Sequence, residues 1–145
     1  MQIDFYILEE SGRQQALRYA CQLIEKACES SQKIYIHTDS QQDAERMNDL
    51  LWIYRDDTFL PHQIYNPADD SPPPVQIGFG DIPAAQQDVL VNLGMQVPAV
   101  FQQFQRVIEI VFSDPHVQQL GRERFRQYRD QGCELNTYKI KANEL

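Results

Sequence analysis

The chain has 145 residues, of which 42% are hydrophobic, and it carries a formal net charge of -8. This length predicts a single domain over residues 1–145 with one sizeable core. The acidic balance disfavours general binding to duplex nucleic acid, which needs a broad cationic surface, and leaves at most weak direct DNA contact.

The first eight residues, MQIDFYIL, begin directly with a strand-like run. They contain no charged leader with a small-residue cleavage site, and no apolar stretch of about 18 residues follows anywhere in the chain. We therefore expect a soluble, cytoplasmic protein without a membrane partner.

Strands and helices alternate through the first half of the chain. Ser11 and Gln14 resemble a capping box at the start of the first helix. The predicted order is a strand over residues 3–8, a helix over 11–31, a strand over 33–37 and a helix over 40–54. This alternation predicts an α/β fold, a Rossmann-like doubly wound sheet that is mainly parallel and flanked by helices.

The second half opens with the segment NPADDSPPP, residues 66–74, whose successive prolines predict a surface loop. Strands are predicted over residues 75–79, 89–93 and 107–112, a helix over 97–105, and an arginine-rich helix over 115–131. No internal repeat interrupts this order.

The three cysteines are an odd number, and two of them stand seven positions apart in a helical pattern. That spacing places Cys21 and Cys28 on one helix face, as small buried groups. The pattern disfavours both a disulfide and a zinc site.

Nucleotide-binding motifs are missing from the sequence. The first strand is followed by EESGRQQ, which is neither GxGxxG nor GxxxxGK[ST], so it provides no nest for a phosphate. His37 and Asp39 end the second strand, where doubly wound sheets often bind ligands, and they leave an enzymatic or nucleotide-sensing domain as the alternative. Because no nucleophile accompanies them in a recognisable motif, we expect no catalytic site, no cofactor and no metal.

The segment GRERFRQYRDQG, residues 121–132, concentrates four arginines on an acidic chain. At about 100° per residue, one helical stripe holds Gln118, Arg122, Phe125, Arg126 and Arg129. Such a stripe can hold a carboxylate between guanidinium groups beside an apolar contact, which predicts an acidic partner. A solvated helix face is the alternative interpretation.

Two blocks, LLWIYRDDTFLPH and LGRERFRQYRDQGCELNTYK, occur in the order and spacing of a known family. The chain resembles the chi subunit of bacterial DNA polymerase III holoenzyme over nearly its whole length. The resemblance implies a clamp-loader accessory protein, a non-catalytic subunit of a DNA-directed DNA polymerase. It also implies two partners: the psi subunit, which forms a heterodimer with chi and tethers it to the clamp loader, and the acidic C-terminal tail of single-strand DNA-binding protein.

The resemblance assigns the tail to the arginine-rich helix. By position, Arg122 matches the family arginine that meets the terminal carboxylate of the tail, and Phe125 stands where the family often has tyrosine. Gln118 takes a place where lysine can occur, so one charged contact is missing here. The remaining residues matched to this pocket are Arg126, Arg129, Val111, Val117 and Gly132.

The resemblance assigns psi to the first block, through Trp52 and Phe59. Aromatic side chains of this size dominate interfaces when they are exposed. Without the resemblance, burial of both rings in the core is the ordinary interpretation. A helicase is a further candidate partner for the Trp52 surface.

Overall fold

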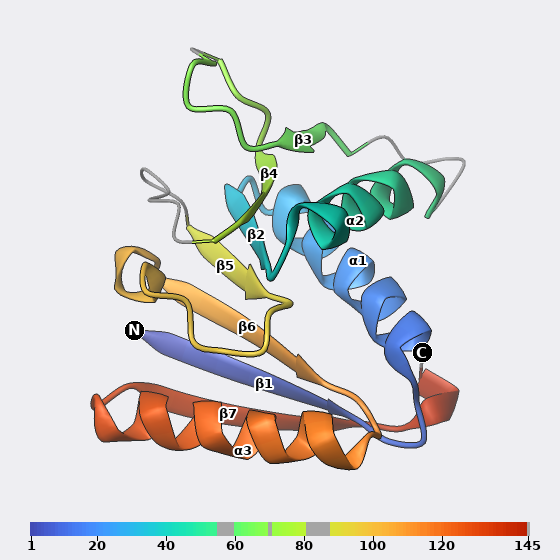
Figure 1. Ribbon diagram of the computed structural model, residues 1–145, viewed down its shortest axis with the longest axis vertical. Helices are drawn as coiled ribbons and strands as arrows, with labels where there is room; N and C mark the ends of the chain where they lie inside the picture. Colours follow the sequence, from blue (N-terminus) through green and yellow to red (C-terminus); the bar gives the residue numbers. More distant parts are fainter. Residues whose placement is uncertain (55–59, 70, 81–87, 145) are drawn as a thin grey trace.

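The computed structural model describes residues 1–54, 60–69, 71–80 and 88–144. A seven-stranded sheet forms its centre, in the order β3-β4-β2-β5-β6-β1-β7, and every pairing between neighbouring strands is parallel (Figure 1). The strands are β1 (Gln2–Leu8), β2 (Ile34–Thr38), β3 (His62–Ile64), β4 (Val75–Phe79), β5 (Val89–Asn92), β6 (Arg106–Val111) and β7 (Glu134–Ile140). The predicted α/β fold with a parallel sheet is confirmed.

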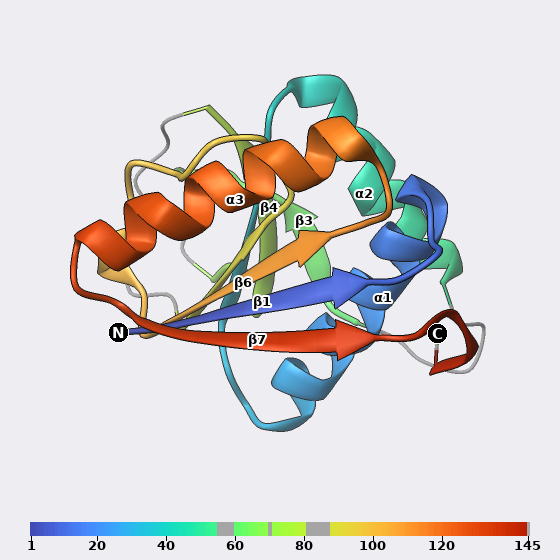
Figure 2. The same ribbon diagram turned by 90° about the horizontal axis from the view of Figure 1, so that it is seen from below.

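Three helices cover the two faces of the sheet. Helices α1 (Arg13–Glu29) and α2 (Gln41–Ile53) pack on one face, and α3 (Pro115–Asp130) packs on the other (Figure 2). The chain crosses the sheet in one direction from β1 through β2 to β3, and in the other direction from β3 to β7. Because crossovers between parallel strands are right-handed, α1 and α2 lie on one face and α3 lies on the other. In the described part of the chain, no helix is long and apolar enough to cross a membrane.

Side-chain caps fix the starts of α2 and α3. The Ser40 hydroxyl accepts a hydrogen bond from the Asp43 amide at 3.1 Å. The Asp114 carboxylate accepts from the amides of His116 and Val117, and Pro115 occupies the first turn, where its missing N–H costs nothing. The arginine-rich helix therefore begins where the sequence predicts, with Gln131 as its C-cap.

The start of α1 differs from the prediction. Its N-cap is Gly12, whose amide donates to the Gln15 side chain at 3.0 Å, one residue later than the predicted pair of Ser11 and Gln14. The Ser11 hydroxyl instead donates to the carbonyl of Glu9. The helix also ends at Glu29, because Ser31 adopts a positive φ of 61°.

The predicted helix over residues 97–105 is wrong. Only a 3-10 turn, η1 (Phe101–Gln103), forms there. Phe101 and Phe104 are buried at a spacing of three residues, which suits a 3-10 turn, and the amide of Gln105 already donates to Asp88 beside β5. The loop over residues 66–74 is confirmed for its described positions.

Two strands are absent from the prediction. β3 has only three residues, and β7 is exposed along most of its length, so neither shows the alternation of apolar and polar residues that marks a half-buried strand. Both lie at edges of the sheet. β7 pairs with β1 over seven residues, from Gln2 opposite Glu134 to Leu8 opposite Ile140.

Each face of the sheet has its own apolar cluster. Under α1 and α2 the cluster includes Leu8, Ile24 and Met47, and under α3 it includes Phe5, Phe101 and Tyr128. Cys21 lies fully buried in the first cluster, as predicted, whereas Cys28 is only half-buried. Burial raises the pKa of the Cys21 thiol to about 12.

This raised pKa predicts a loss of stability in alkaline solution. The unfolded chain releases the Cys21 proton above a pH of about 8.5, whereas the folded protein retains it, so the free energy of unfolding falls as pH rises. Between about pH 8 and pH 10, Cys21 should account for a loss of about 2 kcal/mol. Urea unfolding of the wild type and of Cys21→Ala measures this, and equal pH slopes would contradict it.

Candidate functional site

A groove of about 600 Å³ lies between α3 and the end of the sheet formed by β6, β1 and β7. Side chains from all four elements line it: Phe5 and Ile7 of β1, Val111 of β6, Thr137 of β7, and Gln118, Gln119, Gly121, Arg122, Phe125 and Arg126 of α3. Four of the predicted stripe residues therefore come together in one groove, with Val111 beneath them.

The floor of the groove is apolar. Phe125 is half-buried and meets Phe5 edge-on, with ring centroids 5.3 Å apart. Gly121 allows α3 to lie close to β6, because a Cβ atom there would stand 2.9 Å from a methyl carbon of Val111. The groove can therefore accept a large apolar side chain between the helix and the sheet.

Two cations stand at its rim. Arg122 and Arg126 are exposed on neighbouring turns of α3, and neither has an ion-pair partner among the described residues. Their guanidinium groups thus remain available to a ligand, next to an apolar floor. This arrangement suits an acidic group adjoining an apolar one.

Three predicted site residues lie outside the lining of the groove. Arg129 is exposed and approaches Asp130 at 3.6 Å. Val117 is buried and lines a different cavity, and Gly132 follows α3 with a φ of 79°. A direct contact to a ligand in the groove is therefore supported best for Arg122, Phe125, Arg126 and Gln118.

The remaining arginine of residues 121–132, Arg124, has a role that the sequence analysis missed. Arg124 is buried, and its Nε atom donates to the Glu109 carboxylate at 3.0 Å. The same carboxylate accepts from the Tyr128 hydroxyl at 2.6 Å and from the Asn92 side chain at 2.8 Å. The sequence signal for this role was the single acid in the apolar strand RVIEIV, residues 106–111. An acid buried in a strand requires a hydrogen-bonding or charged partner.

Burial raises the pKa of Glu109, and the guanidinium of Arg124 opposes that rise. Burial also raises the pKa of Tyr128, and the adjacent carboxylate adds to the effect. Tyr128 therefore keeps its proton, and its hydroxyl donates a hydrogen bond to Glu109. Arg124 and Tyr128 thereby fix the inner side of α3 against β6, and Asn92 adds a third donor from β5.

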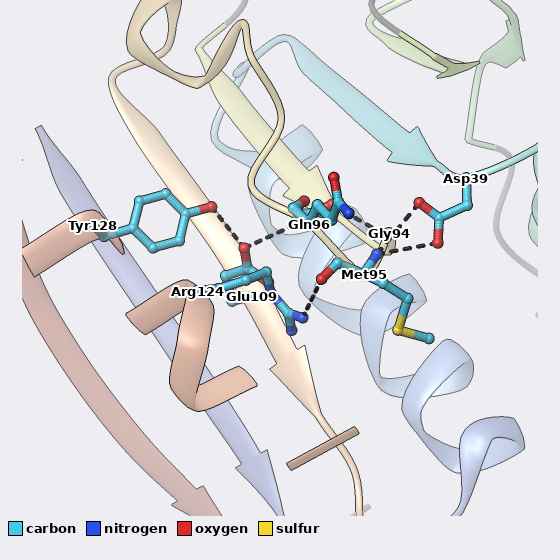
Figure 3. Close-up of polar contacts among 8 residues, drawn as sticks. Asp39, Gly94, Met95, Gln96, Glu109, Arg124 and Tyr128 are labelled. Carbon is cyan, nitrogen blue, oxygen red and sulfur yellow. Dashed lines mark hydrogen bonds and ion pairs between the residues drawn. The ribbon is translucent and has the colours of Figure 1, made fainter. Parts of the chain in front are cut away.

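The same network extends to the loop after β5 (Figure 3). Arg124 donates to the carbonyl of Met95 at 3.0 Å, and the Met95 amide donates to the Asp39 carboxylate at 3.1 Å. A Cβ atom at position 94 would lie 2.6 Å from the Asp39 carboxylate, so Gly94 leaves room for that carboxylate beside the Met95 amide. This loop thus ties the end of β2 to α3.

A second cavity of about 440 Å³ opens at the carboxyl ends of β2, β5 and β6. Asp39 lines it, together with Thr38, Arg46 and residues of the α1 N-terminus, whereas His37 does not. The Thr38 hydroxyl donates to the Gly78 carbonyl at 2.9 Å, so it is engaged within the sheet. No group of three or more metal-ligating side chains occurs among the described residues.

Trp52 lies at the end of α2, far across the sheet from the groove. Its side chain is 53% exposed, and its ring contacts the His62 ring at a centroid distance of 4.6 Å. Ile53, beside it, is 73% exposed. Burial of Trp52 in the core is therefore wrong, whereas Phe59 lies outside the described residues.

Comparison with known proteins gives consistent matches. A family profile described as "DNA polymerase III chi subunit, HolC" matches residues 1–136. Three similar proteins are named DNA polymerase III subunit chi. The chain is 32% identical to that of Pseudomonas aeruginosa, 30% identical to that of Haemophilus influenzae and 25% identical to that of Escherichia coli K12. The matches cover 92–95% of this chain and 94–96% of each relative.

Among solved structures, T4 UvsW is similar in fold, with a TM-score of 0.67 at 9% sequence identity. The match covers 97% of this chain but only 41% of the UvsW chain. At this identity the likeness concerns the fold alone.

The buried pair predicts strong coupling between Glu109 and Arg124. Arg124→Leu and Glu109→Gln should each lower the free energy of unfolding by about 3 to 5 kcal/mol, because each leaves a buried partner unmatched. The double variant should lose less than the sum by about 2 kcal/mol, since it removes both charges and leaves neither one buried without its partner. Urea unfolding measures the cycle.

Arg129→Leu is the control for that cycle, because it breaks only the exposed contact with Asp130 and should cost about 1 kcal/mol or less. Additive losses in the double variant would show that the buried pair is not coupled.

Proposed function

Because this chain belongs to the DNA polymerase III chi subunit family, we propose that it links two protein partners during DNA replication. One partner is the acidic C-terminal tail of single-strand DNA-binding protein, held in the groove beneath α3. The other is the psi subunit, bound at the Trp52 surface and tethering the chain to the clamp loader. The observation that carries this proposal is that two exposed arginines, Arg122 and Arg126, stand at the rim of an apolar groove.

The groove matches the chemistry of such a tail. A terminal carboxylate meets Arg122, whose planar guanidinium can donate two parallel hydrogen bonds to it. The preceding apolar side chain packs on Phe125 and the floor formed by Phe5 and Val111. Acidic residues upstream remain near Arg126 at the rim.

Gln118 stands at the same rim without a charge. Its amide can donate one hydrogen bond, but it does not add to the positive potential that attracts an acidic peptide. Arg129 acts over a longer distance, as a cation on the same helix outside the groove. We therefore assign the main ionic contacts to Arg122 and Arg126.

Several features of the second surface favour a protein partner. Trp52 and Ile53 form an exposed apolar pair at the end of α2, and exposed aromatic side chains of this size are frequent hot spots. Phe59, outside the described residues, follows shortly after in the sequence. A helicase is a second candidate for this same surface. The chain itself is proposed to lack catalytic activity and to act through these contacts.

Arg122→Ala should weaken binding of an acidic peptide with a large apolar C-terminal residue by at least about tenfold, because a desolvated charge pair typically contributes about 2 to 5 kcal/mol. Isothermal titration calorimetry measures this. Arg46→Ala removes the same charge from an exposed site outside the groove and should leave the affinity within about twofold. Equal losses in both variants would mean that only net charge matters.

Trp52→Ala should weaken psi binding by about 2 kcal/mol or more, while the affinity for the tail peptide stays unchanged. The expectation follows from the opposite positions of α2 and α3 on the sheet. Titrating each variant with each partner gives the readout, and Arg122→Ala should show the reverse pattern. Competition between psi and the peptide for the wild-type protein would refute a bridge.

A further inference from the structure

The outer edge of β7 is open. β7 is the last strand of the sheet, and the described residues supply no strand beside it (Figure 2). It is seven residues long, and most of its side chains are exposed. An exposed edge of this length is a template for a further strand.

The hydrogen bonds to β1 identify which backbone groups face outward. The Glu134 amide donates to the Met1 carbonyl at 3.1 Å, and the Ile140 carbonyl accepts from the Glu9 amide at 2.8 Å. Because backbone groups alternate in direction along a strand, the even-numbered residues from Glu134 to Ile140 face β1. The amides and carbonyls of Leu135, Thr137 and Lys139 therefore point away from the sheet.

The side chains of these three residues lie on the α3 face. Thr137 lines the groove, and Leu135 packs against the apolar cluster beneath α3. Lys139 follows on the same face by the alternation of the strand, and it is exposed, as is Lys141 beyond the strand. The groove and the open edge thus meet on one strand, and both carry positively charged side chains.

We propose that the outer edge of β7 receives the acidic segment upstream of a peptide whose C-terminus occupies the groove, as an eighth strand of the sheet. This inference rests on the proposed function of the groove. Main-chain hydrogen bonds to Leu135, Thr137 and Lys139 hold the segment, whatever its side chains, and Lys139 and Lys141 favour acidic ones. Neighbouring strands lie about 4.8 Å apart, so a peptide that leaves the groove over Thr137 is already next to the position of an eighth strand.

A second copy of this chain is a less suitable occupant. Two β7 edges that paired with each other would bring together two proteins that each carry a net charge of -8. An acidic extended peptide meets the opposite charge instead.

Residue-resolved amide hydrogen exchange tests the proposal with two peptides. The short peptide ends in acids, a large apolar residue and a free carboxylate, and the long one adds about seven acidic residues upstream, the length of β7. The long peptide should slow exchange at Leu135, Thr137 and Lys139 by at least about tenfold, whereas Asn136 and Tyr138 are already protected by β1. The short peptide should leave all five amides unchanged.

Binding measurements on two variants give an independent readout. Lys139→Pro removes an outward amide without breaking a bond to β1, and Lys139→Gln removes the charge but keeps the amide. The long peptide should bind wild type about tenfold more tightly than the short one. Lys139→Pro should abolish this gain, Lys139→Gln should keep most of it, and neither should change the affinity for the short peptide.

The outcomes separate the two proposals. Failure of the short peptide to bind would overturn the function proposed for the groove. Binding of the short peptide without protection of the outward amides by the long one would overturn the eighth strand alone. Protection of the outward β7 amides that grows with protein concentration in the absence of peptide would also overturn the eighth strand, in favour of pairing between two copies of the chain.

Discussion

The buried pair of Glu109 and Arg124 is the interaction on which the rest of the groove depends. Burying two charges is unfavourable unless their remaining hydrogen-bonding groups are satisfied. Here Tyr128 and Asn92 donate hydrogen bonds to the Glu109 carboxylate, and the Met95 carbonyl accepts one from the Arg124 guanidinium. With its inner face fixed in this way, α3 has one rotational setting about its own axis.

That setting determines the direction of the exposed arginines. Arg122 and Arg126 lie two positions before and after Arg124, so each is turned by about 200° from it around the helix. Since Arg124 faces the sheet, its neighbours face outward over the groove. An arginine used for internal structure thereby orients the two others that we propose to bind the peptide, and Gly121 sets how closely the helix lies above Val111.

Local sequence signals predicted much of this structure. The predicted start of the arginine-rich helix at residue 115 agrees with α3, and the helical stripe correctly grouped Gln118, Arg122, Phe125 and Arg126. The stripe also included Arg129, which lies outside the groove, because periodicity gives an angle around the helix but not the extent of the sheet beneath it. The role of Arg124 depends on Glu109, fifteen residues earlier and on another element, and no local pattern connects the two. β7 went unpredicted because, in an edge strand that is exposed along most of its length, apolar and polar residues show no clear period of two.

The position of β1 has a consequence for how the chain folds. β1 precedes the other strands of the sheet in the chain, yet its two neighbours in the sheet are β6 and β7. Its polar contacts span the same distances, since Asp4 pairs with Arg106 and Asn136, 102 and 132 residues later. Such long-range contacts must close large loops before any stabilisation is gained, which slows folding. On the ribosome, the apolar residues of β1 therefore lack their neighbouring strands until β6 and β7 have been synthesised. During that interval they are the segment most in need of protection from aggregation.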